Sequence, residues 1–195
     1  LFGNVADAQH FGQARSKALQ RPADLPAIQG PCLMFIGAID AYKLDLAMLE
    51  ALIASTPQWT YVLIGPVGET DPSTDVEPLA SYPHVHLLGP RPYAGLPAYL
   101  ASADVALLPL QLNDYTRHMY PMKFFEYLAA GCPVVATAIP SLLDQGDVAT
   151  LCRPDATAFQ QSIAAVLKGD APALEQRLAR AEQFTYERRT ASMLH

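Results

Sequence analysis

Apolar residues occur along this chain in short continuous runs, separated by polar, glycine-rich or proline-rich segments. Runs of this kind are typical of strands that are buried on both faces of a sheet. Apolar residues also recur at helical spacing after several of these runs, as at 46–53, 96–103 and 157–167. The pattern predicts strands at 32–36, 59–64, 84–88, 105–108, 134–136 and 148–152.

The regular order of strand and helix predicts an α/β fold. Right-handed crossovers would build a Rossmann-like, doubly wound parallel sheet of about six strands with helices on both faces. Residues 1–20 predict a short surface helix, and the prolines and glycine of 21–31 predict a linker. We therefore divide the chain into a leading segment and linker, 1–31, and a single domain, 32–195.

The composition and net charge of the chain limit the classes of ligand that it is expected to bind. With 195 residues, 51% hydrophobic and 16% charged, the chain can bury a core as one domain. A net charge of -6 argues against a nucleic-acid binder, which would show a basic face. The chain has four lysines, and Lys43 and Lys123 fall in predicted strand-to-helix loops. This placement favours an anionic ligand that is met by a few positioned cations.

Cysteines and histidines give no sign of a metal site. Cys32, Cys132 and Cys152 lack metal-ligand spacing, and we interpret them as small core residues of a protein in a reducing compartment. His84 and His86 are interpreted as ordinary polar positions of a strand. No apolar run reaches the length of about 18 residues that a membrane span needs. The chain begins at a leucine rather than a methionine, and we expect it to be a fragment.

The stretch 107–140 carries the strongest chemical signal. It predicts the end of a buried strand, a polar loop, a helix with Pro121 in its first position, and a second buried strand. A helix N-terminus beyond the carboxyl ends of parallel strands offers free N–H groups to an anion. Lys123 in the first turn would oppose the helix dipole unless an anion is bound. Glu126 shares a face with Lys123, and the alternative interpretation is an ion pair on a solvated helix.

A second candidate for anion binding follows the first predicted strand. Gly37 ends that strand and Lys43 precedes the next helix. A glycine lets the backbone approach a phosphate, and a lysine near a helix N-terminus adds charge. The spacing matches neither the Walker motif nor the dinucleotide fingerprint.

The residues 120–135, YPMKFFEYLAAGCPVV, resemble a known signature. It is the P-x-K-x-x-E-Y-L-A-A-G-x-P-V-V text of the nucleotide-sugar-binding half of retaining glycosyltransferases with the GT-B fold. Weaker matches cover nearly the whole chain, most densely at 96–140. The resemblance implies that this chain is one half of a GT-B fold and that an N-terminal acceptor-binding domain is missing from it.

The resemblance also implies roles for individual residues. Glu126 would hold the ribose hydroxyls of the donor, and Lys123 would contact its diphosphate. His118 stands where many members have an acidic residue near the transferred sugar, and Asn113 with Thr116 matches an N-x-x-T subgroup. The implied catalytic residues are Lys123, Glu126 and His118, and the implied binding residues are Gly37, Lys43, Gly65, Arg91, Tyr93, Asn113, Thr116, Arg117, Tyr120, Pro121, Met122, Lys123 and Glu126.

The expected activity is transfer of a sugar from a UDP- or GDP-sugar to an acceptor, with retention, in glycan or polysaccharide biosynthesis. We expect no metal and no other cofactor, and we expect the isolated domain to be inactive. Two alternatives stay open: a nucleotide-sugar epimerase of the same architecture, and a non-catalytic nucleotide-binding module. A cytoplasmic location is expected, with association at the inner face of the membrane through the missing domain left open.

Overall fold

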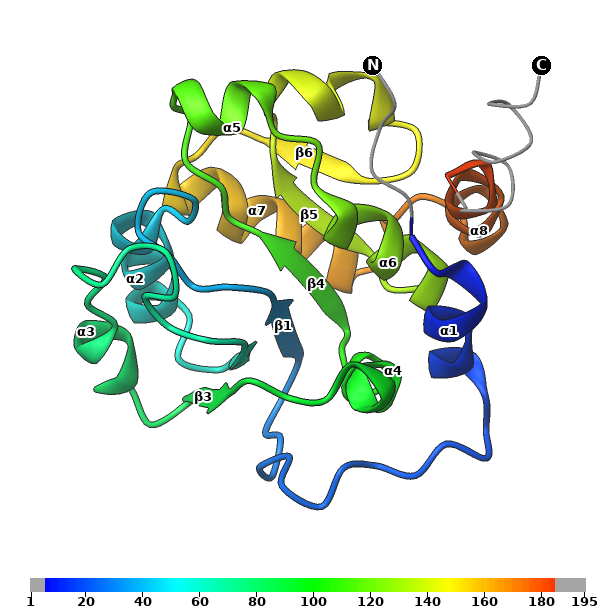
Figure 1. Ribbon diagram of the computed structural model, residues 1–195, viewed down its shortest axis with the longest axis horizontal. Helices are drawn as coiled ribbons and strands as arrows, with labels where there is room; N and C mark the ends of the chain where they lie inside the picture. The colour runs from blue at the N-terminus through cyan, green and yellow to red at the C-terminus, as the bar shows by residue number, and fades with distance from the viewer. Residues whose placement is uncertain (1–5, 185–195) are drawn as a thin grey trace.

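The computed structural model of the chain describes residues 6–184 (Figure 1). One all-parallel sheet of six strands has the order β3-β2-β1-β4-β5-β6, which is the strand order of a Rossmann fold. The predicted doubly wound sheet is therefore confirmed. Its strands are β1 (Cys32–Ile36), β2 (Thr60–Ile64), β3 (Val85–Gly89), β4 (Val105–Leu108), β5 (Val134–Thr137) and β6 (Thr150–Cys152).

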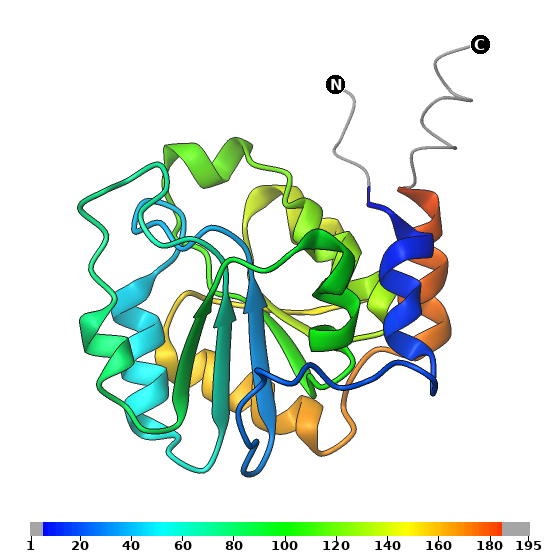
Figure 2. The same ribbon diagram turned by 60° about the horizontal axis from the view of Figure 1, so that its bottom comes forward.

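Helices cover both faces of the sheet. Helices α2 and α7 pack together on one face, with α3 beside α2, while α1, α4, α6 and α8 cover the other (Figure 2). The α-helices are α1 (Ala8–Gly12), α2 (Leu46–Ser55), α3 (Glu77–Ala80), α4 (Leu96–Leu100), α5 (Asp114–His118), α6 (Met122–Ala130), α7 (Ala156–Leu167) and α8 (Leu174–Gln183), and the short 3-10 helices are η1 (Gln13–Arg15), η2 (Tyr93–Gly95) and η3 (Pro140–Gln145).

The core lies between the sheet and these helices. Every residue of β1, β2, β4 and β5 is buried, as their continuous apolar runs predict. Cys32 and Cys132 are buried in this core, and burial raises the pKa of both thiols to about 12. The cysteines are thus packing residues, as expected, with Cys152 half-buried at the sheet edge.

The segment before the first strand is part of the same packed unit. Helix α1 contacts α6 and α4, and Phe11 is fully buried. In the linker, the carboxylate of Asp24 accepts hydrogen bonds from Arg91 at 2.6 Å and from the hydroxyl of Tyr99 at 2.7 Å. The linker is therefore fastened to α4 and to the loop after β3.

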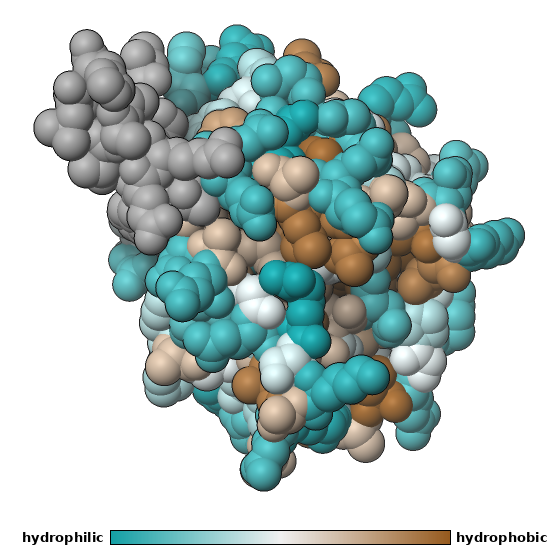
Figure 3. All heavy atoms as spheres, turned by 90° about the vertical axis from the view of Figure 1, so that its right-hand side faces the viewer, coloured by the Kyte–Doolittle hydropathy of each residue, from teal (hydrophilic) through white to brown (hydrophobic). Residues whose placement is uncertain are grey.

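The outer surface on the side of α1 and α8 is mostly hydrophilic, with hydrophobic side chains near its centre and in smaller separate spots around it (Figure 3). Among residues 6–184, no helix has the length and apolar character needed to cross a bilayer. The weaker family matches include Asn4 and Val5 near one end and Thr185 and Tyr186 near the other, and these residues lie outside the described ones. Arg188 and Arg189, which the sequence places on a solvated helix face, lie outside them as well.

The segment 109–120 differs from its prediction as a polar loop. It contains the short helix α5, which begins with a capping box: the Asn113 side chain accepts from the Thr116 backbone N–H at 3.0 Å, and the Asn113 N–H donates to the Thr116 hydroxyl at 3.0 Å. This local exchange of hydrogen bonds stabilises a helical turn that has too few apolar residues to show a periodic pattern. Other boundaries shift by a few residues; α4, for example, ends at Leu100 rather than 103.

Candidate functional site

The site lies where the order of the sheet reverses, between β1 and β4. Ligands of open α/β sheets bind in the crevice beyond the carboxyl ends of the strands at such a point. Here the structure has a cavity of about 250 Å³ between the ends of β1 and β4 and the beginning of α6. Its walls are formed by Phe35, Gly37, Ala38, Lys43, Leu44, Leu108, Leu110, Tyr115, Met119, Tyr120, Pro121, Met122 and Lys123.

A larger cavity, of about 580 Å³, lies near the amino-terminal ends of β2 and β3. His84 and His86 line it, but no lysine or arginine does. The His84 ring lies 3.2 Å from the carbonyl oxygen of Ile53, so it has a local structural contact. The smaller cavity combines cations with the position expected for a ligand, and we take it as the candidate site.

Helix α6 opens onto this cavity. Its first residue is Met122, and Pro121 is the residue before the helix, with an extended backbone at φ -75° and ψ 110°. The prediction that Pro121 occupies the first helical position is therefore wrong by one residue. The first backbone hydrogen bond at the start of α6 is donated by the Phe124 N–H to the Pro121 carbonyl oxygen at 3.2 Å. The N–H groups of Met122 and Lys123 precede it, so they can reach an anion.

Tyr127 fixes α6 relative to the end of β1, and Gly131 ends the helix. The Tyr127 hydroxyl accepts from the Ile36 N–H at 2.8 Å and donates to the Ile36 carbonyl at 3.1 Å. Burial raises the pKa of Tyr127, which keeps this hydroxyl protonated and able to donate. Gly131 ends the helix with φ +83°, a left-handed conformation that favours glycine. The E-Y-L and A-A-G letters of the signature therefore include residues that hold the helix in place.

Lys123 and Glu126 form an ion pair at the start of α6. The Lys123 Nζ lies 2.7 Å from Glu126 Oε2, with the two side chains 30% and 4% exposed. The pair is thus not on a solvated helix surface. Lys123 lines the cavity, whereas Glu126 is not one of its lining residues. The structure brings only the lysine of this predicted pair directly to the cavity wall.

Gly37 and Gly65, the two glycines predicted to bind the ligand, lie in different places relative to the cavity. Gly37 lines the cavity. Gly65 does not; it has φ +150°, and a Cβ added there would lie 1.9 Å from the Gly37 carbonyl oxygen. Gly65 therefore lets the ends of β1 and β2 come together, which is a structural role, and its predicted ligand contact stays a prediction.

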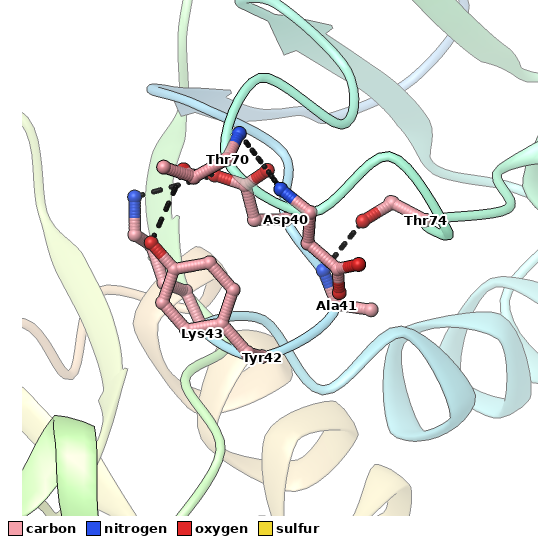
Figure 4. Close-up of polar contacts among 7 residues, drawn as sticks. Asp40, Ala41, Tyr42, Lys43, Thr70 and Thr74 are labelled. Carbon is pink, nitrogen blue, oxygen red and sulfur yellow. Dashed lines mark hydrogen bonds and ion pairs between the residues drawn. The ribbon is translucent and has the colours of Figure 1, made fainter.

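Lys43 reaches the cavity from the loop between β1 and α2. Its Nζ lies 3.3 Å from Oδ2 of Asp40, whose side chain is fully buried. Asp40 also accepts hydrogen bonds from the backbone and hydroxyl of Thr70 and from the backbone of Asp71. Figure 4 shows this cluster between the loops that follow β1 and β2. The two loops are joined at this buried carboxylate.

Two other residues predicted to contact the ligand, Arg91 and Tyr93, contact neighbouring protein groups. The Arg91 guanidinium binds Asp24, the Tyr99 hydroxyl and the carbonyl oxygens of Leu88 and Pro90. Tyr93 is half exposed and its ring stacks on His10 with centroids 4.4 Å apart. Neither Arg91 nor Tyr93 lines the cavity.

The predicted N-x-x-T pair is the capping box of α5. Besides capping the helix, Asn113 donates from Nδ2 to the Tyr42 carbonyl at 2.7 Å, and Thr116 is fully buried. Arg117 and His118 are exposed at the end of α5, and Arg117 contacts Asp114 at 3.5 Å. None of these side chains lines the cavity, because their polar groups satisfy the backbone or face solvent.

Sequence reasoning missed Tyr115 and Asp40. Tyr115 lines the cavity, is 50% exposed and meets the Tyr42 ring edge to face at 5.0 Å. An aromatic residue in a polar segment was the available signal for Tyr115. Asp40 lies three residues before Lys43 in the sequence, but its partners Thr70 and Asp71 are far along the chain, so no local pattern marks it.

The described residues contain no group of three or more His, Cys, Asp or Glu side chains that could hold a metal ion. The expectation that the reaction needs no metal is not tested by this observation and stays a prediction.

Comparison with known proteins gives three kinds of match. A sequence model of the family described as glycosyl transferases group 1 matches residues 30–169. TuaH of Bacillus subtilis, described as a glycosyltransferase of teichuronic acid biosynthesis, is 35% identical over 113 residues, covering 58% of this chain and 28% of TuaH.

Among solved structures, sucrose-phosphate synthase of Thermosynechococcus elongatus matches with a TM-score of 0.72 and 23% identity over 98% of this chain and 49% of that chain. Anabaena HepE, solved in complex with UDP and glucose, matches with a TM-score of 0.64 and 20% identity over 80% of this chain and 45% of that chain. These structural likenesses support the fold. The chain thus spans less than half the length of these relatives.

Proposed function

Because the chain belongs to the glycosyl transferases group 1 family, we propose that it is the half of a GT-B glycosyltransferase that binds a nucleoside-diphosphate sugar. UDP- and GDP-sugars are the donors that we propose. The UDP in the HepE structures supports a uridine nucleotide for this fold, although that observation belongs to HepE.

One observation carries the proposal: a cavity at the β1/β4 reversal lined by Lys43, Lys123 and the beginning of α6. A diphosphate needs cations and hydrogen-bond donors in one place. The helix supplies free N–H groups and the positive end of its dipole, and the lysines supply two ammonium groups. The remaining walls are mostly apolar, which strengthens these electrostatic contacts by excluding water.

The same groups would act during sugar transfer. Negative charge builds on the leaving nucleoside diphosphate as its bond to the sugar breaks. Donors that are already in position stabilise that charge without reorganising. We propose that Lys43, Lys123 and the α6 N–H groups provide this stabilisation, that transfer proceeds with retention, and that no metal is required.

Glu126 is proposed to accept hydrogen bonds from the ribose hydroxyls. Its carboxylate is nearly buried and bonded to Lys123, so this contact requires the side chains of the pair to move when the donor binds. A diphosphate would compete for Lys123 and release an oxygen of Glu126. His118 and Arg117, exposed at the end of α5, remain our candidates for contacts with the transferred sugar.

The complete reaction needs a second half that binds the acceptor. We propose that this half lies elsewhere in a longer protein and that the present chain alone binds donor without turning it over. TuaH is described by its role in teichuronic acid biosynthesis, which supports an acceptor in polysaccharide synthesis. We propose that the protein works in the cytoplasm, at the inner face of the membrane.

Calorimetric titration with UDP and GDP tests the proposal. We expect one nucleotide to bind, and Lys43→Ala to weaken binding about tenfold or more, since a hydrogen bond to a charged group contributes about 1.5–3 kcal/mol. Lys168→Ala is the matched control, because Lys168 is exposed and does not line the cavity. Absence of binding by either nucleotide, or equal binding by Lys43→Ala and wild type, would contradict the proposal.

A second test addresses turnover and metal independence. A longer protein that includes the acceptor-binding half should release nucleoside diphosphate from its donor, and EDTA should leave the rate unchanged. Loss of the rate with EDTA and its recovery with a divalent cation would show that a metal is needed.

A further inference from the structure

We infer that Asp40 is a positioning residue, which holds the ammonium group of Lys43 at the wall of the cavity. The inference rests on the proposed function, since it assigns Lys43 to the diphosphate. It concerns a residue that does not line the cavity and would act only through the lysine.

The two carboxylate oxygens of Asp40 have different partners. Oδ1 accepts from the backbone N–H groups of Thr70, at 3.1 Å, and Asp71, at 3.2 Å. Oδ2 accepts from the Thr70 hydroxyl at 2.8 Å and from Lys43 Nζ at 3.3 Å. One oxygen therefore bonds to the backbone of the neighbouring loop, and the other is shared between the Thr70 hydroxyl and the lysine.

The carboxylate itself is held rigidly. It is fully buried, and Ile39 pairs with the loop after β2 through hydrogen bonds to Pro66 and from Gly68. Backbone N–H groups cannot change position without moving that loop. A buried charge with this many donors stays ionised and stays in place.

Lys43 needs such an anchor. A lysine side chain has many rotamers, and fixing it costs conformational entropy. Here the Asp40 carboxylate attracts the ammonium group from one side, while the Tyr42 ring lies 5.0 Å from Nζ on another. Tyr42 is itself tied to Thr70 through its hydroxyl at 3.2 Å (Figure 4). The conformational entropy of the Lys43 side chain is then lost during folding rather than during ligand binding.

The substitution Asp40→Asn separates the two functions of the carboxylate. The asparagine oxygen can still accept from the N–H groups of Thr70 and Asp71, while its amide nitrogen replaces the oxygen that accepts from Lys43 and from the Thr70 hydroxyl. Thr70→Val is the matched control. It removes the hydroxyl that bonds to Asp40 Oδ2 and to the Tyr42 hydroxyl, and it leaves the contact between Asp40 and Lys43.

The first measurement uses no nucleotide. NMR relaxation of the lysine ammonium groups should show Lys43 more ordered than the exposed Lys17 and Lys168. Asp40→Asn should bring Lys43 to the mobility of those two, and Thr70→Val should change it little. A wild-type Lys43 as mobile as Lys168 would overturn the inference, and this result does not depend on whether Asp40→Asn folds.

The second measurement is a double-mutant cycle with UDP as the probe. Asp40→Asn should weaken binding by about the same factor as Lys43→Ala, roughly tenfold, and the double variant should be no weaker than either. Additive losses, unchanged or tighter binding by Asp40→Asn, or an equal loss with Thr70→Val would each overturn the inference. If Asp40→Asn does not fold, Asp40→Glu replaces it, since it keeps the charge but displaces the lysine.

The two measurements also separate this inference from the function on which it rests. An ordered Lys43 in a wild-type protein that does not bind UDP or GDP would contradict the proposed function and still confirm the contact. Nucleotide binding with a mobile Lys43 would support the function and contradict the role of Asp40.

Discussion

Two lysines reach the same cavity from different supports, one from a loop and one from a helix. Each is paired with a buried carboxylate at a separation of three in the sequence, Asp40 with Lys43 and Lys123 with Glu126. The loop carboxylate has three donors besides its lysine. Within the described residues, Glu126 receives a side-chain hydrogen bond from Lys123 alone.

This difference decides what a substitution can reveal. Removing Lys43 leaves a carboxylate that is still satisfied, so the change in ligand affinity reports mainly on the ligand contact. Removing Lys123 leaves a buried charge without its partner, so folding and binding change together. The loop pair is therefore the cleaner test of function, and the helix pair is more important for stability.

The substitution with the largest expected effect is at Gly65, where the ends of β1 and β2 support the Lys43 loop. It does not alter α6. Gly65→Ala would place a Cβ 1.9 Å from the Gly37 carbonyl oxygen, at a residue with φ +150°. We expect the free energy of unfolding to fall by about 3 kcal/mol or more, measured by urea denaturation.

Gly146→Ala is the control for this change, because nothing lies within 4 Å of its added Cβ and its φ is -65°. A Gly65→Ala protein as stable as the control would show that the ends of β1 and β2 separate easily. The fixed position of the Lys43 loop would then be in doubt.

The next effect tests the helix pair. Lys123→Ala should lower the free energy of unfolding by about 2 kcal/mol, below the range for fully buried pairs because Lys123 is 30% exposed. The double variant Lys123→Met/Glu126→Gln should recover part of the loss, since it removes the buried charge. Lys43→Ala should change stability by less than about 1 kcal/mol. Equal losses for the two lysine variants would refute the contrast between the pairs.

The smallest effect is a dependence on pH that belongs to the loop pair. Burial alone would raise the pKa of Asp40, but hydrogen bonds from Thr70, Asp71 and Lys43 outweigh it and bring the pKa below its usual value. The ionised Asp40 carboxylate therefore stabilises the fold at pH values above its unfolded-state pKa of about 3.9. This stabilisation is lost as the pH falls through the folded-state pKa of Asp40.

The measurement is the difference in unfolding free energy between wild type and Asp40→Asn, followed from neutral pH to about pH 3. We expect wild type to lose its advantage on acidification, by less than about 1 kcal/mol. Asp24, whose pKa is also lowered, is present in both proteins, so its contribution to the difference in unfolding free energy cancels. A difference that stays constant over this range would contradict the ionised, hydrogen-bonded state of Asp40.

The fold was predictable from sequence because burial on both faces leaves a continuous apolar run. The strand predicted at 32–36 is β1, and the one at 105–108 is β4. Helix α5 could not be predicted in this way, because its stability comes from the exchange of hydrogen bonds between Asn113 and Thr116. The family resemblance includes the same two residues, and the ligand contact that it implies for them stays a prediction.

The site was predictable in part for a related reason. Gly37, Lys43 and the residues from Tyr120 to Lys123 follow predicted strands or open a predicted helix, and they line the cavity. The bond between Arg91 and Asp24 could not be predicted, because Asp24 lies in a linker with no regular pattern. Asp40 was missed because its partners follow another strand. Contacts between loops after neighbouring strands depend on tertiary structure, which local periodicity does not encode.

The paired lysines also have a consequence for turnover. In the proposed function, Lys43 stays beside Asp40 when a nucleoside diphosphate leaves, and the Lys123 ammonium group returns to Glu126. The empty cavity therefore holds no bare cation that would retain the product, and departure is less costly than from a site of unpaired lysines. In enzymes whose rate is limited by product release, such an arrangement trades some affinity for speed.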